Sequence, residues 1–162
     1  MKTAKVEFDY LVFDSIKELD AADAELLDAA RKATRNSFAI FSNFKVGAAA
    51  RLKNEKEIMI GSNQENASYP VGICAERVLL GSASSLYPDI AIETMAISYQ
   101  SKTVKSDHPI SPCGMCRQAL QEFEGRMQKP IRLILSGMEG KVFIIKSASL
   151  LLPLAFTNEE LG

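Results

Sequence analysis

Apolar residues recur along the chain with the spacing of helices in some segments and of strands in others. Between Ser15 and Phe38 they fall three, four or one residue apart, as in an amphipathic helix. These positions are Leu19, Ala22, Leu26, Leu27, Ala30 and Ala33. Two later segments, Glu76 to Leu86 and Arg117 to Phe123, also carry enough apolar residues to form an inward helical face. Helices are expected in all three segments.

Five short apolar or alternating runs, each bounded by Gly, Asn, Ser or Pro, predict strands. They are Val46 to Leu52, Glu57 to Ile60, Thr94 to Tyr99, Ile131 to Leu135 and Val142 to Ile145. Within residues 1–14 a further alternation is compatible with an extra strand, an interface arm or a disordered end. No internal repeat or linker divides the chain, so residues 1–162 are expected to form one domain.

The charge balance bears on the kind of substrate. Nineteen Lys and Arg residues face 20 Asp and Glu residues, for a formal net charge of -1. Such a chain has no overall cationic field to attract nucleic acid, which favours a small-molecule substrate. No segment reaches the apolar length of a membrane span, and the start lacks the pattern of a secretory signal. A cytoplasmic protein with no membrane partner is expected.

The three cysteines carry the strongest chemical signal. Cys74 stands alone, whereas Cys113 and Cys116 form a Cys-x-x-Cys pair. Without a secretory signal, this spacing favours metal or redox use over a disulfide framework. Three thiolates can hold zinc and leave its fourth tetrahedral position for water, whereas structural zinc sites are normally closed. Both cysteine segments are expected to open helices, where free N–H groups favour the thiolate that zinc requires.

Two other uses of the cysteines stay open. The pair could be redox-active, or His108 could complete a closed structural zinc site. The closed site would leave Glu76, two residues after Cys74, without a role. Zinc deaminases place a glutamate that is not a ligand next to a metal-binding residue in this way. Apart from its histidine, the polar stretch Ser101 to His108 resembles an ordinary surface loop.

Four separated motifs together resemble the free cytidine deaminases. They are FSNFKVGAA at 41–49, NQENASYP at 63–70, GICAER at 72–77 and SPCGMCRQ at 111–118. The resemblance covers roughly Phe41 to Phe156. It implies a three-layer α/β/α fold around a mixed five-stranded sheet. It also implies hydrolysis of cytidine and 2′-deoxycytidine to the uracil nucleosides and ammonia, in a homotetramer with one zinc ion per subunit.

The same resemblance implies the catalytic roles. Cys74, Cys113 and Cys116 would be the zinc ligands, and Glu76 the proton shuttle. Zinc lowers the pKa of its bound water, so that hydroxide can attack C4 of the cytosine base near neutral pH. Glu76 would take the water proton, protonate N3 and later protonate the departing amino group. The backbone N–H of Ala75 would hold the base oxygen.

Further positions match the family's nucleoside-binding residues. Asn63 and Glu65 correspond to the amide and carboxylate that read the ribose 3′-hydroxyl. Phe44 corresponds to an aromatic residue packed beside the pyrimidine. Tyr69 and Phe156 resemble residues that complete a neighbouring subunit's pocket in tetrameric members. Each of these side chains could alternatively serve only a turn or the core.

Arg77 matches a residue whose guanidinium hydrogen-bonds the metal-binding sulfurs. Three thiolates around zinc leave a net negative charge, which a nearby cation offsets. Three other functions stay open: a deaminase of a cytosine-bearing antibiotic nucleoside such as blasticidin S, a polynucleotide deaminase, and a catalytically silent zinc protein. The segment 63–67 and the retained Glu76 favour the nucleoside enzyme.

Overall fold

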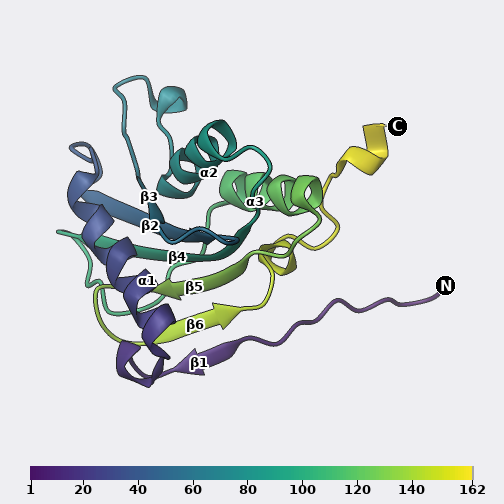
Figure 1. Cartoon of the computed structure of the whole chain (residues 1–162), viewed down its shortest axis with the longest axis horizontal. Helices are drawn as coiled ribbons and strands as arrows, with labels where there is room; N and C mark the ends of the chain where they lie inside the picture. The colour runs from purple at the N-terminus through teal and green to yellow at the C-terminus, as the bar shows by residue number, and fades with distance from the viewer. Residues whose placement is uncertain (162) are drawn as a thin grey trace.

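The computed structural model describes residues 1–161 as a mixed six-stranded sheet with helices on both faces (Figure 1). The sheet order is β1-β6-β5-β4-β2-β3, in which β4 and β5 are parallel and all other neighbours antiparallel. The strands are β1 (Leu11–Phe13), β2 (Phe44–Leu52), β3 (Ile58–Ser62), β4 (Ile92–Ser101), β5 (Arg132–Ser136) and β6 (Val142–Ile145).

The five strands predicted from the sequence correspond to β2 through β6. The sixth strand, β1, comes from residues 1–14 and pairs antiparallel with the edge of β6. Tyr10, just before it, packs against Phe143 with ring centroids 4.9 Å apart and the two rings tilted by 57°. The α/β prediction is confirmed, and the sheet exceeds the predicted five strands because this short edge strand is added. Three residues are too few for an apolar alternation to predict a strand reliably.

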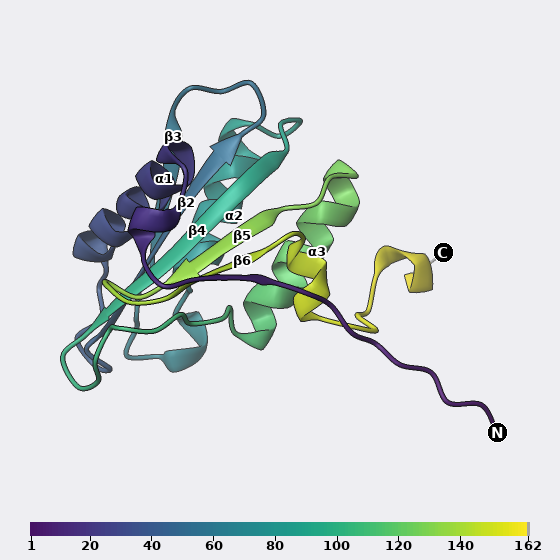
Figure 2. The same cartoon turned by 90° about the horizontal axis from the view of Figure 1, so that it is seen from below.

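Three helices cover the sheet. Helix α1 (Ala21–Ala33) packs on one face, and α2 (Ala75–Leu86) and α3 (Gly114–Met127) pack on the other, which gives three layers (Figures 1 and 2). Helix α1 is shorter than the segment Ser15 to Phe38 because Asp20 caps its start, accepting a hydrogen bond from Asp23 N at 2.8 Å. Short 3₁₀ turns cover Ile16–Glu18, Thr34–Asn36, Tyr69–Val71, Ala148–Leu151 and Asn158–Leu161.

Two glycines allow the helices to approach the sheet closely. A Cβ on Gly47 would lie 2.1 Å from Ala30 O of α1, and a Cβ on Gly61 would lie 2.4 Å from Ala75 O of α2. Real Cβ atoms essentially never come within 3.0 Å of another heavy atom, so neither position has room for a side chain. Gly61 therefore sets the depth at which the start of α2 sits on the sheet.

A buried carboxylate holds the far end of α3. Glu124 accepts hydrogen bonds from the backbone N–H groups of Ile131 at 2.6 Å, Ala148 at 2.8 Å and Ser149 at 3.1 Å, and from the Ser147 hydroxyl. Unpaired buried charge is costly, and these donors satisfy it. Glu124 therefore joins α3 to the residue directly before β5 and to the start of the 3₁₀ turn after β6.

The two chain ends project from the same side of the domain (Figure 2). Residues 1–10 are extended and exposed. Within residues 1–161, no helix is both long and apolar enough to cross a membrane.

Candidate metal centre and active site

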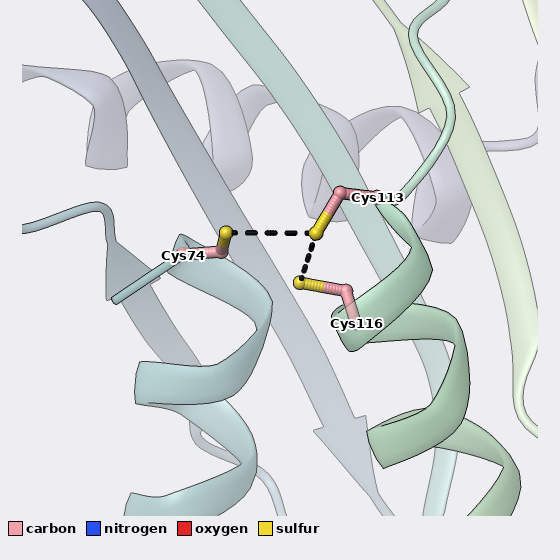
Figure 3. A group of neighbouring side chains, drawn as sticks. All are labelled: Cys74, Cys113 and Cys116. Atoms are coloured by element: carbon pink, nitrogen blue, oxygen red, sulfur yellow. Dashed lines mark hydrogen bonds between the residues drawn. The ribbon is translucent and has the colours of Figure 1, made fainter. Parts of the chain in front are cut away.

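The three cysteines converge at the starts of α2 and α3 (Figure 3). Cys74 is the N-cap residue of α2, Cys113 is the N-cap residue of α3, and Cys116 lies in the first turn of α3. Cys113 Sγ lies 3.8 Å from Cys74 Sγ and 3.5 Å from Cys116 Sγ, and the three sulfurs all lie within 4.8 Å of one another. Zinc–sulfur bonds of about 2.3 Å in a tetrahedron separate sulfurs by roughly 3.8 Å. The cluster therefore fits zinc.

The surroundings of the cluster favour a thiolate at Cys74. The pKa of the Cys74 thiol is lowered to about 6, chiefly because its sulfur accepts a hydrogen bond from the Cys116 thiol. The Cys113 thiol and the charge of Arg77 lower it further. The same contact with Cys74, together with burial, raises the pKa of Cys116 above its ordinary value. Neither N-cap cysteine uses its side chain to cap a backbone N–H of its helix, so both sulfurs remain directed to the cluster and available to a metal.

Glu76 lies beside the cluster in the first turn of α2. It is only 4% exposed. Burial raises its pKa to about 7, and the negative charge of Cys74 adds to the effect. A carboxyl group poised near neutrality can both accept and return a proton. Its neighbour Ala75 is the first residue of α2, so its backbone N–H has no acceptor within the helix.

One cavity of about 610 Å³ links the cysteines to the predicted nucleoside-binding residues. Its size suits a small molecule. Its lining residues are Phe41, Ser42, Phe44, Val46, Asn63, Gln64, Glu65, Asn66, Tyr69, Gly72, Ile73, Cys74, Glu76, Ile110, Ser111 and Cys113. The cavity therefore joins segments that are up to 72 positions apart, from Phe41 to Cys113.

The side chain of Asn63 is held against β2. Its Oδ1 accepts from Val46 N at 2.7 Å, and its Nδ2 donates to Phe44 O at 2.9 Å. An amide nitrogen carries two hydrogens, so one remains for another acceptor. This fixed amide borders the cavity.

Glu65 is held by the 41–42 turn. Its carboxylate accepts from Phe41 N at 2.8 Å, and from the backbone N–H and hydroxyl of Ser42. These donors, with the Ser42 hydroxyl first, hold the pKa of Glu65 below its ordinary value. Ser42 itself was not predicted as a site residue, although it lies within the 41–49 motif that carries the resemblance.

Tyr69 and Phe156 lie apart in this chain. Tyr69 is 76% exposed, lines the cavity of its own chain and meets Phe41 edge-on at 6.2 Å. Phe156 is 58% exposed and is not among the cavity-lining residues, and its carbonyl accepts from Gln118 Nε2 at 2.8 Å. Whether either side chain reaches a neighbouring subunit stays a prediction.

Arg77 and His108 both lie near the cysteines in sequence. Arg77 was expected to hydrogen-bond the metal-binding sulfurs and His108 was considered as a fourth zinc ligand, but both make other contacts. The Arg77 guanidinium donates to Met115 Sδ at 4.0 Å. Its charge lowers the pKa of Cys74, but within residues 1–161 it makes no direct hydrogen bond to a cysteine sulfur. His108 instead faces the Tyr99 hydroxyl at 3.1 Å. Over residues 1–161 the three cysteines are the one group of three or more potential metal ligands, so a closed site with His108 is not supported.

Ile110 and Ser111 line the cavity and were not predicted from the sequence. Both precede Cys113 closely, and Ser111 opens the 111–118 motif, which is the only signal that could have marked them.

Comparison with known proteins agrees with this geometry. A sequence model described as "Cytidine and deoxycytidylate deaminase zinc-binding region" matches residues 20–129. The chain is 34% identical over 137 residues to a cytidine deaminase of Halalkalibacterium halodurans, a match that covers 85% of this chain and 96% of that protein. It is also 34% identical to a cytidine deaminase of Sporosarcina psychrophila, over 85% of this chain and 93% of that protein.

Among solved structures, the chain resembles the crystal structure of a cytidine deaminase from Burkholderia pseudomallei. The TM-score is 0.70 at 36% identity, and the match covers 82% of this chain and 97% of that one. The shared fold and the cysteine cluster confirm the prediction of a zinc-binding α/β domain.

Proposed function

The chain belongs to the cytidine and deoxycytidylate deaminase family, and on that premise we propose that it hydrolyses cytidine and 2′-deoxycytidine to uridine and 2′-deoxyuridine. Water enters and ammonia leaves. The observation that carries the proposal is the cavity of about 610 Å³, whose lining combines Cys74, Cys113 and Glu76 with Asn63 and Glu65. The cysteines and Glu76 would supply the hydrolytic chemistry, and Asn63 and Glu65 would bind the sugar.

Cys74, Cys113 and Cys116 would hold one zinc ion per subunit. When bound, zinc acts as a Lewis acid that makes a water molecule nucleophilic near neutral pH. Glu76 accepts a proton from the attacking water and delivers it to N3 of the base. It then transfers the second water proton to the amino nitrogen, which departs as ammonia while C4 becomes a carbonyl carbon. Burial of Glu76 supports this role, because solvent does not compete for its proton.

Neighbouring groups would orient the base. The free N–H at the start of α2, on Ala75, donates to the base oxygen O2. Phe44 packs beside the pyrimidine ring. Support for these roles comes from the position of Ala75 as the first residue of α2 and of Phe44 in the cavity lining.

Asn63 and Glu65 would select a nucleoside over the free base. A ribose 3′-hydroxyl can accept from the remaining Nδ2 hydrogen of Asn63 and donate to the Glu65 carboxylate. Because both side chains are already held by backbone groups, they present this pair of contacts without reorganising. Free cytosine cannot make either contact.

We further propose that the chain forms a single domain and assembles as a homotetramer, which serves pyrimidine salvage in the cytoplasm. In it, Tyr69 and Phe156 would contact the cavity of a neighbouring subunit. Their exposure, 76% and 58%, supports an interface role. Light scattering tests the assembly, and a fully active monomer would remove this role for both residues.

The function is tested by following ultraviolet absorbance with zinc-quantified protein and four substrates. Cytidine and 2′-deoxycytidine are expected to lose the cytosine chromophore, whereas free cytosine is expected to react far more slowly. Blasticidin S is included because an antibiotic nucleoside shares the reacting base. Turnover of blasticidin S alone would contradict the assignment of the substrate pocket, and no turnover of any substrate would contradict the proposed activity.

A further inference from the structure

Tyr99 is a fully buried phenol beside the cavity that does not line it. It lies near the end of β4, and its hydroxyl oxygen is 3.0 Å from Lys105 O and 3.1 Å from His108 Nδ1. A phenol has one hydrogen to donate. Because Lys105 O can only accept, the phenol donates to it, and an N–H of His108 donates to the phenol oxygen. His108 Nδ1 also lies 3.2 Å from Asp107 Oδ1.

The ring of Tyr99 supports one wall of the cavity. It stacks on Phe44 with ring centroids 4.9 Å apart and an interplanar angle of 15°. The two residues are diagonal neighbours on β4 and β2, since Tyr99 pairs with Val46 and Phe44 pairs with Ser101. Phe44 lines the cavity, so the ring of Tyr99 sets the tilt of the surface that faces the base.

The hydroxyl of Tyr99 acts on another part of the cavity. It contacts the segment that leads from β4 to the cysteine pair, and only four residues separate His108 from Cys113. Two of the four are prolines, whose rings fix φ and stiffen the connection. The other two, Ile110 and Ser111, line the cavity. A shift at His108 is therefore passed along a short, stiff segment to the metal-binding cysteine.

The same segment is clamped at a second point, against the turn between β5 and β6. Glu139 N, in that turn, donates to Ser106 O at 3.2 Å, and Ser101 N, at the end of β4, donates to Ser106 Oγ at 3.0 Å. A Cβ on Gly137 would lie 2.2 Å from Ser106 O, and one on Gly140, which has φ +79°, would lie 2.0 Å from Asp107 O. The segment is therefore packed closely on the sheet end and has little freedom to absorb a change at Tyr99.

We propose that Tyr99 is a positioning residue that links the aromatic wall of the cavity to its metal-binding wall. Its ring holds Phe44 for binding of the base, and its hydroxyl holds the segment from Lys105 to Cys113 for metal binding and turnover. Tyr99 does not touch the substrate. The inference rests on the proposed function, because the base and the metal are those of the deamination reaction.

Three variants and one control separate the two contacts. Tyr99→Phe keeps the ring and removes the hydroxyl, Tyr99→Leu removes both, and His108→Ala removes one partner of the hydroxyl. Val104→Ala is the control directly before the segment Lys105 to Cys113, because Val104 is 52% exposed. For each variant, KM and kcat for cytidine are measured with zinc-quantified protein, together with the rate of zinc release to a chromogenic chelator.

The ring and the hydroxyl are expected to affect different quantities. Tyr99→Phe and His108→Ala are expected to lower kcat and to speed zinc release by about 3- to 10-fold, with KM nearly unchanged. Tyr99→Leu is expected also to raise KM by about 5-fold, since the aromatic stack on Phe44 is lost. Val104→Ala is expected to match the wild type in all three quantities.

Failure of the inference is distinguishable from failure of the proposed function. Zinc-loaded wild type that does not turn over cytidine would overturn the proposed function, and unchanged zinc release in Tyr99→Phe and His108→Ala would overturn the hydroxyl's role independently of activity. An active wild type whose variants keep its kcat, KM and zinc release, and differ only in thermal stability, would overturn the inference alone. If Tyr99→Leu does not fold, its expected rise in KM is tested with Tyr99→Val, and the hydroxyl's role with the other two variants.

Discussion

Replacement of Gly61 by alanine is expected to displace the catalytic end of α2. The new Cβ would lie 2.4 Å from Ala75 O and 2.8 Å from Leu79 N, whereas ordinary contacts begin near 3.4 Å. Both contacts are backbone atoms, which cannot rotate away as a flexible side chain could. The start of α2 must therefore move by about 1 Å, and Cys74 and Glu76 move with it.

Two magnitudes follow from this displacement. Overpacking a close helix–sheet contact costs about 2 kcal/mol in the free energy of unfolding. Displacing catalytic groups by about 1 Å lowers turnover by roughly 100-fold. The assay measures kcat for cytidine, zinc content and unfolding in urea on the same preparation of Gly61→Ala.

Two matched substitutions isolate the cause. Gly81→Ala lies on the same helix, where an added Cβ meets nothing within 4 Å, and it is expected to raise stability by about 0.5–1 kcal/mol with kcat unchanged. Gly47→Ala presses on α1, on the opposite face, with a Cβ 2.1 Å from Ala30 O. It is expected to destabilise the fold about as much as Gly61→Ala, but to lower kcat far less, because α1 carries no site residue. Wild-type kcat and stability in Gly61→Ala would refute the reasoning.

Three further predictions concern ion pairs and titration. Asp23→Ala removes the carboxylate that accepts from both terminal nitrogens of Arg132, at 2.7 and 2.5 Å. It is expected to lower the free energy of unfolding, measured in urea, by about 2 kcal/mol without changing kcat, and an unchanged free energy would contradict the role of the pair. Ser42→Ala removes the main donor that holds the pKa of Glu65 below its ordinary value, so it is expected to destabilise the protein near neutrality. The difference in Tm from wild type is expected to shrink as the pH falls below the ordinary pKa of a glutamate and Glu65 protonates in the folded state too; a difference independent of pH would exclude this cause. Arg77→Gln is expected to lower turnover more than zinc content, because the positive charge of the guanidinium stabilises the thiolate of Cys74. Unchanged turnover with full zinc content would contradict this role of Arg77.

Much of the fold could be predicted because its signals are local. The apolar spacing located α1 and the five strands β2 through β6, and the cysteine segments opened α2 and α3 as expected. The edge strand β1 was left among three alternatives, because its pairing with β6 depends on a partner about 130 residues away. The depth of α2 on the sheet was also not readable, since a glycine such as Gly61 shows its purpose only when the opposing backbone is known.

The candidate site divides in a similar way. The cysteine cluster was predictable because residue type and spacing specify the chemistry of a metal ligand. Ser42 and Tyr99 were not, because a serine in a turn and a tyrosine in a strand have many uses in proteins. Their roles depend on contacts with Glu65 and Phe44, which sequence spacing does not encode. His108 was considered as a metal ligand because of its position in the sequence, whereas its contact is with the Tyr99 hydroxyl.

The most direct test of the account compares wild type with Glu76→Gln in one time course, with zinc content measured for both. Glutamine keeps the size of the side chain but cannot carry the proton, so it isolates the proposed chemistry from packing. The account predicts that wild type converts cytidine to uridine with one ammonia released per uridine formed. It predicts that Glu76→Gln binds zinc and loses turnover by more than about 100-fold. Wild-type turnover in zinc-loaded Glu76→Gln would contradict the central claim.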